Sequence, residues 1–242
     1  DVKYIKEKGM PVGTSLEISD LFFNTPARRK FLKGERAEYA TIAEVVTTIS
    51  LAHPQVAFKL HRDGELIFDY PPSANLKERL LVTHYREWVK YLLPLDVRSE
   101  TVTIKGYIGK AELSKVNRTG QLFFINKRPV KSLSLSYALQ SAYQGLLPQR
   151  HFPVALIFLE IEPSTVDVNI HPTKREVRLQ DERMIQGQLI HCLKKTLGKG
   201  DHSPRVSFSY SLDKRKTYAQ RSAPVSFDFK ELKERAGGDR YL

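Results

Sequence analysis

The chain has 242 residues, of which 41% are hydrophobic, enough to bury one ordinary core or two small ones. Its 39 Lys and Arg exceed its 27 Asp and Glu, and the net charge of +12 favours a polyanionic partner, nucleic acid first, through release of condensed counterions. The single cysteine, Cys192, excludes an internal disulfide framework or a clustered thiolate metal site and fits a cytoplasmic protein. No apolar run is long enough to span a bilayer, so no membrane partner is expected.

The first third of the chain carries a strand pattern, a helix pattern and a hairpin pattern in turn. Residues 14–22 alternate loosely between apolar and polar side chains, which predicts a half-buried strand. Apolar side chains recur at helical spacing over residues 35–52, which predicts a helix. In residues 56–70, apolar and polar side chains alternate on both sides of Asp63 and Gly64. Because these two residues tolerate a positive φ, a β-hairpin is expected.

A proline pair, Pro71 and Pro72, fixes an extended connection and marks the best internal boundary. We therefore expect a first part at residues 1–72, a second domain at residues 73–197, and a flexible linker or tail at residues 198–242. In the second domain, helical patterns begin at residues 75 and 133 and cover residues 184–197, and strand patterns cover residues 102–104, 121–125, 154–161 and 166–170. The expected fold class is α+β, without tandem repeats.

Two segments place polar or charged side chains after a predicted strand. In the first, Gly13 and Thr14 precede residues 21–31, where three consecutive cations follow a turn. In the second, residues 166–178, a strand ends at a loop that offers Lys174, a flexible ammonium suited to a phosphate. The ordinary alternative for such a lysine is a solvated turn. The sequence contains no complete motif for a phosphate-binding loop, a zinc protease or a serine hydrolase.

Together these segments resemble the signature motifs of MutL DNA mismatch repair proteins. Residues 13–17 and 21–31 are similar to the motif that ends the family's ATP-binding domain, and residues 167–177 are similar to the signature of its second domain. Between them, residues 124–130 resemble the family's phenylalanine-valine-asparagine-glycine-arginine segment. The resemblance covers about residues 9–197, with the motifs in the same order and at similar spacing.

The resemblance implies a member of the GHKL group of ATPases. Its fold would be α+β, the end of a Bergerat-type ATPase domain followed by a ribosomal protein S5 domain 2-like fold. Thr14 would lie near the adenine side of the ATP site, and Lys174, the candidate catalytic residue, would bind the γ-phosphate and stabilise charge as the phosphoryl group leaves. Arg128 would lie in the family's DNA-binding groove, where Lys127 and Lys131 add positive charge around the same turn. A solvated turn is the alternative for Arg128.

The sequence departs from the family pattern in several ways. Lys127 stands where the family usually has glycine, so a different turn geometry is possible. The family's general-base glutamate, magnesium-binding asparagine, adenine-reading aspartate, glycine-rich lid and C-terminal dimerisation domain are absent, and the chain does not begin with methionine. We therefore expect the intact protein to bind ATP and Mg²⁺, and these residues alone to bind no cofactor and to be inactive as an ATPase.

The partners that the resemblance implies are DNA, a MutS-type mismatch-recognition protein, a downstream nuclease or helicase, and a second copy in a homodimer. Two other classes of protein stay open. A stand-alone S5-like nucleic-acid-binding module is allowed by the basic charge, but Gly13 and Thr14 together with Lys174 disfavour it. The transducer of a type II topoisomerase relative also has a phosphate-reaching lysine, but residues 24–29 disfavour it.

Overall fold

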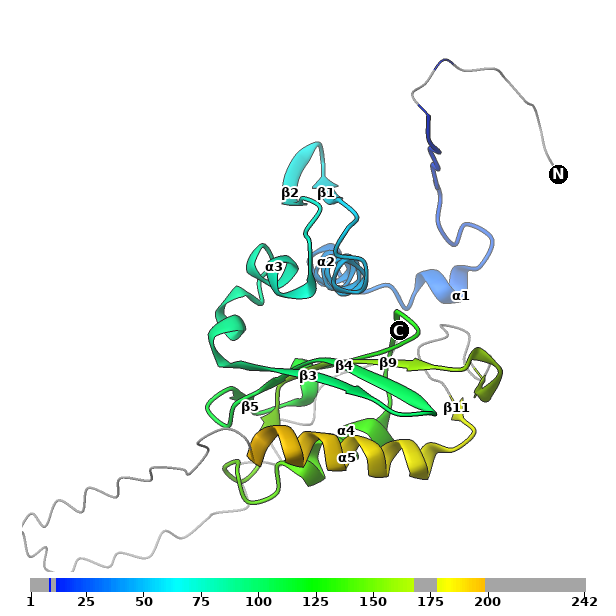
Figure 1. Ribbon diagram of the computed structural model, residues 1–242. Coiled ribbons are helices and arrows are strands. Elements are labelled where there is room, and N and C mark those ends of the chain that lie inside the picture. Colours follow the sequence, from blue (N-terminus) through cyan, green and yellow to red (C-terminus); the bar gives the residue numbers. More distant parts are fainter. Residues whose placement is uncertain (1–8, 10–11, 168–177, 199–242) are drawn as a thin grey trace, which may run out of the picture. The chain divides into compact units, whose positions relative to one another are not determined.

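The computed structural model describes residues 9, 12–167 and 178–198, all within the first of two compact units, residues 1–204 and 205–242. The α-helices and 3-10 helices are α1 (Pro26–Arg29), α2 (Glu35–Ala52), α3 (Leu76–Leu81), η1 (Arg86–Tyr91), η2 (Arg118–Gly120), α4 (Leu133–Ala142), η3 (Pro163–Thr165) and α5 (Glu182–Gly198). The strands are β1 (Phe58–Arg62), β2 (Glu65–Tyr70), β3 (Leu92–Arg98), β4 (Val102–Gly109), β5 (Ser114–Lys115), β6 (Gln121–Ile125), β7 (Arg128–Val130), β8 (Phe152–Pro153), β9 (Ala155–Ile161), β10 (Val166–Asp167) and β11 (Arg178–Leu179). The expected α+β class is confirmed (Figure 1). Among these helices none is long and apolar enough to cross a membrane.

A five-stranded mixed sheet forms the centre of the first unit, in the order β3-β4-β9-β6-β7. Neighbouring strands in this sheet run antiparallel to each other, except β9 and β6, which run parallel. A parallel pair needs a crossover connection, and α4 lies in the connection between β6 and β9. Because β9 is central and covered on both faces, its side chains are almost all buried, which explains the continuous apolar run in its sequence.

Helices α4 and α5 cover one face of this sheet, and α2 and α3 lie over the other (Figure 1). Successive side chains of a strand point to opposite faces, and β6 shows this division clearly. Phe123 and Ile125 pack with the apolar sides of α4 and α5, whereas Leu122 and Phe124 pack with the opposite cluster. The sheet is therefore an internal layer between two sets of helices.

The cluster on the α2 and α3 side contains two stacked rings, Phe124 and Phe158, whose centroids are 4.3 Å apart. The Tyr85 hydroxyl donates a hydrogen bond of 2.7 Å to a carboxylate oxygen of Glu44 on α2. Burial, with the help of this contact, raises the pKa of Tyr85 far above its usual value. The buried members of the cluster are Leu51, Ala52, Leu80, Tyr85, Trp88, Phe124, Val154 and Leu156.

A buried arginine, Arg79 of α3, joins the loop after α2 to the hairpin. Its Nη2 donates hydrogen bonds of 2.6 Å to the carbonyl oxygens of Pro54 and Val56. Its guanidinium carbon lies 5.9 Å from the ring centroids of both Phe58 and Tyr70. Desolvation lowers the pKa of Arg79, but carbonyl dipoles and aromatic faces around the group favour the cation.

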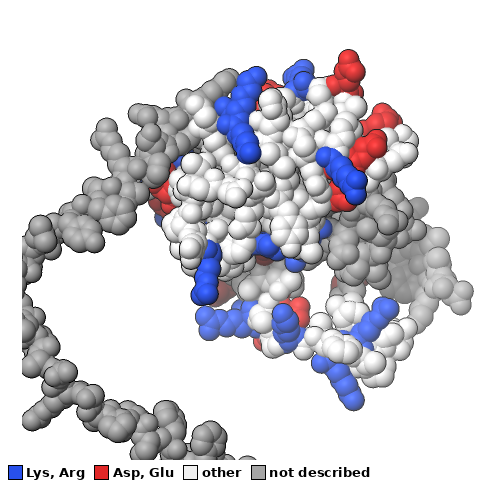
Figure 2. Space-filling view, turned by 90° about the horizontal axis from the view of Figure 1, so that it is seen from below, with Lys and Arg blue, Asp and Glu red and all other residues white. Residues whose placement is uncertain are grey.

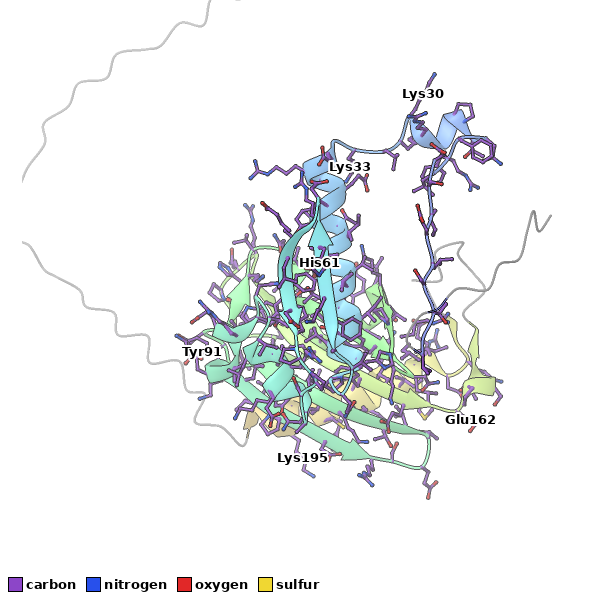
Figure 3. All side chains as sticks on the ribbon, turned by 90° about the horizontal axis from the view of Figure 1, so that it is seen from above. Lys30, Lys33, His61, Tyr91, Glu162 and Lys195 are labelled. Carbon is purple, nitrogen blue, oxygen red and sulfur yellow. The ribbon has the colours of Figure 1, made fainter. Side chains whose placement is uncertain are left out.

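Strands β1 and β2 form the predicted hairpin, with Asp63 and Gly64 at φ 50 and 83 in the turn. The hairpin lies alongside α2, as Figure 3 shows with His61 labelled on β1. An ion pair of 2.5 Å between Arg62 and Glu35 joins the end of the hairpin to the start of the helix. This part of the chain therefore folds as its local pattern predicts.

Two strand predictions need correction. The predicted strand over residues 14–22 is wrong, because residues 12–19 form no strand and Leu16 and Ile18 are 82% and 71% exposed. A strand needs a neighbour for its backbone hydrogen bonds, and the described part of the chain supplies none there. The strand β3 was missing from the predicted elements; it contains Pro94, which an edge strand such as β3 tolerates.

Other predictions fall partly outside the described residues. Residues 168–170 of the last predicted strand and almost all of the predicted tail, residues 199–242, lie there. The boundary expected at Pro71 and Pro72 stays a prediction.

Candidate nucleic-acid interface

The turn between β6 and β7 carries the predicted DNA-binding residues. Ile125 pairs with Arg128, so Asn126 and Lys127 form a two-residue turn, at φ 48 and 65. Two positive φ angles are what a type I′ hairpin turn requires. Lys127 thus adopts the left-handed conformation that glycine takes at the lowest cost, and the two-residue turn forms although lysine replaces the family's usual glycine.

Asn126 attaches this turn to the end of the central strand β9. Its backbone N–H donates to the carbonyl oxygen of Leu159 at 2.9 Å. Its side-chain Nδ2 donates to the carbonyl oxygen of Ile161, and the Ile161 N–H donates to Asn126 Oδ1, both at 2.9 Å. Three hydrogen bonds to one neighbouring strand fix the position of the turn relative to the sheet.

Replacing Asn126 with glycine should lower the unfolding free energy by about 1–3 kcal/mol, because both polar backbone groups of Ile161 lose their partner. Glycine keeps the positive φ without strain, so the loss comes mainly from the side-chain hydrogen bonds, with a smaller part from the greater freedom of glycine in the unfolded chain. Asn126→Asp keeps the acceptor for the Ile161 N–H but sets a carboxylate oxygen against the Ile161 carbonyl oxygen, so it should also lower the unfolding free energy. Urea unfolding of the unchanged protein and the two variants provides the measurement. Equal midpoints would show that the hydrogen bonds between Asn126 and Ile161 add nothing to stability.

The predicted DNA-binding side chains Lys127, Arg128 and Lys131 are all exposed. They belong to a long stretch, residues 113–159, that contains no Asp or Glu. Its six cations are Lys115, Arg118, Lys127, Arg128, Lys131 and Arg150. A surface built from this stretch attracts anions without internal neutralisation. This signal is visible in the sequence, and it adds Arg118 to the predicted set.

Figure 2 views the molecule from the side of α4 and α5. Lys and Arg side chains project around a broad, largely uncharged face, and most acidic side chains in view lie toward one edge. Separate cations on an otherwise neutral surface are suited to contacts with a phosphate backbone, which carries a regular series of negative charges.

The predicted ATP-binding residues are not brought together within the described structure. Thr14 is exposed in a segment without helix or strand. Lys174, the predicted catalytic residue, lies outside the described residues, as does most of its signature segment, residues 168–177. The assignments of Thr14 and Lys174 therefore stay predictions.

Cys192 lies on the inner side of α5, beside a groove that α5 forms with β3 and β4. It is only 5% exposed, and burial raises the pKa of its thiol. Both properties disfavour the nucleophilic thiolate. Cys192 therefore acts as a buried small hydrophobic side chain, and the groove contains none of the predicted site residues.

Comparison with known proteins identifies relatives of this chain. Residues 82–198 match the family described as "DNA mismatch repair protein, C-terminal domain". The chain is 39% identical over 192 residues to the DNA mismatch repair protein MutL of Symbiobacterium thermophilum, covering 79% of this chain and 30% of that protein. It is 39% identical over 215 residues to MutL of Chlorobium phaeovibrioides, covering 89% of this chain and 35% of that protein.

A solved structure described as the N terminal domain of a DNA repair protein shares the fold. Its TM-score is 0.61 at 20% identity, over 74% of this chain and 59% of the other. The likeness to this structure shows the fold, and the sequence matches show the family, that of a DNA mismatch repair protein. The chain belongs to the MutL family. It spans about a third of the length of the two MutL relatives.

Proposed function

We propose that the full-length protein is an ATP-dependent, DNA-binding mismatch repair protein that couples mismatch recognition to the processing of a DNA strand. The observation that carries the DNA-binding part is the exposed turn of Lys127 and Arg128, with Lys131 nearby, in a stretch without carboxylates. Asn126 fixes this turn to β9, which limits the entropy lost when its cations bind phosphates. Membership of the MutL family supports the proposal and disfavours a topoisomerase relative.

The ATP-dependent part of the proposal depends on Thr14 and Lys174. Lys174 would supply the positive charge that the γ-phosphate needs as it leaves. The described residues contain no group of three His, Cys, Asp or Glu side chains that could hold a metal ion. The proposed partners are a MutS-type protein, a downstream nuclease or helicase, and a second copy of the protein. The proposed location of the protein is the cytoplasm.

Arg128→Glu in the full-length protein should weaken binding to a nonspecific DNA duplex. Loss of one phosphate contact lowers the slope of log affinity against log salt by about 1, and the new carboxylate adds repulsion. Stimulation of ATP turnover by DNA should disappear, whereas the DNA-free rate should stay nearly unchanged, because Arg128 would not touch the nucleotide. Duplex affinity at several salt concentrations, with ATPase assays on the same preparations, provides the measurement.

Lys77→Glu is the matched control, because it makes the same change in net charge at an exposed position of α3. If both substitutions weaken binding equally, the effect comes from net charge and not from the turn. If Arg128→Glu leaves affinity and salt slope intact, the turn is an ordinary solvated loop and DNA binds elsewhere.

A further inference from the structure

A polar contact joins helix α2 to a residue far along the chain. The Tyr85 hydroxyl donates a hydrogen bond of 2.7 Å to Glu44 Oε1, between residues 41 positions apart. Glu44 belongs to α2, in the part predicted to end the ATP-binding domain, whereas Tyr85 lies within residues 82–198, which match the DNA mismatch repair family. Helices α2 and α3 lie beside each other over the same face of the sheet (Figure 1). The hydrogen bond therefore crosses from one predicted domain to the other.

The donor of this hydrogen bond is held in place by its surroundings. Tyr85 is 3% exposed, and its ring centroid lies 4.3 Å from that of Trp88 and 3.9 Å from that of His84. Burial raises the pKa of Tyr85, so the hydroxyl keeps its proton and stays a donor. The acceptor is a half-exposed carboxylate, whose second oxygen lies 3.6 Å from His84 Nε2. A hydrogen bond to a charged acceptor is stronger than one between neutral groups.

At its C-terminal end, α2 is attached to the sheet by apolar contacts. Leu51 and Ala52 are buried in the cluster that contains Phe124 and Leu156 of the sheet. Apolar contacts are non-directional, and packed elements can slide over one another by small amounts. A hydrogen bond, in contrast, needs a defined distance and angle. Glu44 lies about 10 Å before Leu51 along the helix axis, so the hydrogen bond attaches α2 at another point and fixes the direction of the helix.

We infer that Tyr85 and Glu44 are positioning residues for ATP turnover, because their hydrogen bond sets the angle between the ATP-binding part and the second domain. The inference rests on the proposed function, in which the first part binds the nucleotide and Lys174 of the second domain supplies positive charge to its γ-phosphate. Displacement of such a group by about 1 Å can cost about 100-fold in rate. Tyr85 and Glu44 act through orientation and not through contact with the nucleotide, so loss of the bond slows turnover without weakening ATP binding.

Tyr85→Phe in the full-length protein removes the hydroxyl and keeps the ring. The kcat for ATP hydrolysis without DNA should fall about tenfold, whereas the equilibrium affinity for ATP should stay within about twofold. Glu44→Ala should have the same effect. Glu44→Gln keeps a side-chain oxygen that can accept from the Tyr85 hydroxyl, so it should lose much less turnover. Steady-state turnover and equilibrium ATP binding, measured separately on each variant, provide the test.

Tyr143→Phe is the matched control, because Tyr143 is a buried tyrosine whose hydroxyl donates to the Gly109 carbonyl oxygen within the second domain. Both substitutions remove one hydroxyl from the interior, so a loss of activity caused by lower stability would appear in both. The kcat of Tyr143→Phe should equal that of the unchanged protein at a temperature where both are folded. Equal losses of kcat in the two variants, or an unchanged kcat in Tyr85→Phe, would overturn the inference.

A second measurement reports the orientation of α2 without using ATP. Spin labels are placed at two exposed positions, Ala40→Cys on α2 and Lys194→Cys on α5, and the distribution of distances between them is recorded. The distribution should broaden or shift in Tyr85→Phe but not in Tyr143→Phe. An unchanged distribution in Tyr85→Phe overturns the inference, because the hydrogen bond then does not orient α2.

The outcome for the positioning residues can be separated from the outcome for the proposed function. If the unchanged protein hydrolyses ATP and Tyr85→Phe alters the distances without lowering kcat, the proposed function stands and the inference fails. If the unchanged protein hydrolyses no ATP, the ATP-dependent part of the proposed function fails. Altered distances in Tyr85→Phe would then still support the hydrogen bond as the contact that orients α2.

Discussion

Gly106→Ala is expected to remove at least about 3 kcal/mol of unfolding free energy, a large share of the 5–15 kcal/mol typical of a folded domain. Gly106 lies in β4 between Leu95 of β3 and Ile157 of β9, at φ 129, which side-chain-bearing residues rarely adopt. A Cβ at this position would meet the carbonyl oxygen of Leu156 at 2.0 Å. Both strands would have to move, so the register of three strands is at risk.

Gly187→Ala on α5 is the control for this prediction, since the added Cβ meets nothing within 4 Å and the backbone is helical. This change should leave stability unchanged or raise it by about 0.5–1 kcal/mol, because alanine favours helix. Thermal and urea unfolding of both variants provides the measurement. A Gly106→Ala protein as stable as the Gly187→Ala protein would show that β4 and β9 can separate locally at little cost.

Much of the fold follows from signals that act over a few residues. Asp63 and Gly64 specify their hairpin because both accept a positive φ. Asn75 begins α3 because its side chain accepts a hydrogen bond from the Glu78 N–H. Helix α2 has the bounds that its apolar spacing predicts, Glu35–Ala52. In each case the stabilising contact lies within the segment that carries the pattern.

Strand assignments depended on partners that are distant in the sequence. Residues 14–22 have the alternation of a strand, but no described strand pairs with them. β3 lacks a clear pattern because Pro94 interrupts it, but pairing along seven residues of β4, from Gly109 to Thr103, makes it a strand. Local propensity was outweighed by the presence or absence of a backbone neighbour in both cases.

The candidate site shows the same limit. Arg128 was predicted through the resemblance of residues 124–130; the structure places it at an exposed turn, and its role in DNA binding stays a prediction. The hydrogen bonds from Asn126 to Ile161 join residues 35 positions apart, and the contact of Arg118 with Tyr137 joins η2 to α4 across the β6 and β7 strands. No local pattern predicts either contact. The sequence itself offers two signals for this site, the resemblance of residues 124–130 and the absence of carboxylates from residues 113–159.

In the full-length protein, Lys174→Ala is expected to lower kcat for ATP hydrolysis by about 100-fold or more, while ATP affinity changes only severalfold. The expectation depends on the proposed role of Lys174 at the γ-phosphate. Negative charge on the transferring group is redistributed in the transition state, and a cation placed for that state contributes little to ground-state binding. Loss of one such contact typically costs about 10²–10³ in kcat. Steady-state turnover and equilibrium ATP binding, measured separately, give the two quantities.

Lys194→Ala serves as the matched control, because Lys194 is an exposed lysine of α5 and its loss changes the net charge by the same amount. Turnover by this variant should equal that of the unchanged protein. Lys174→Arg distinguishes position from charge, since a planar guanidinium keeps the charge but not the compact geometry of an ammonium, and partial recovery of kcat is expected. Equal losses of ATP affinity and turnover in Lys174→Ala would mean that Lys174 binds the nucleotide uniformly and gives the transition state no added stabilisation.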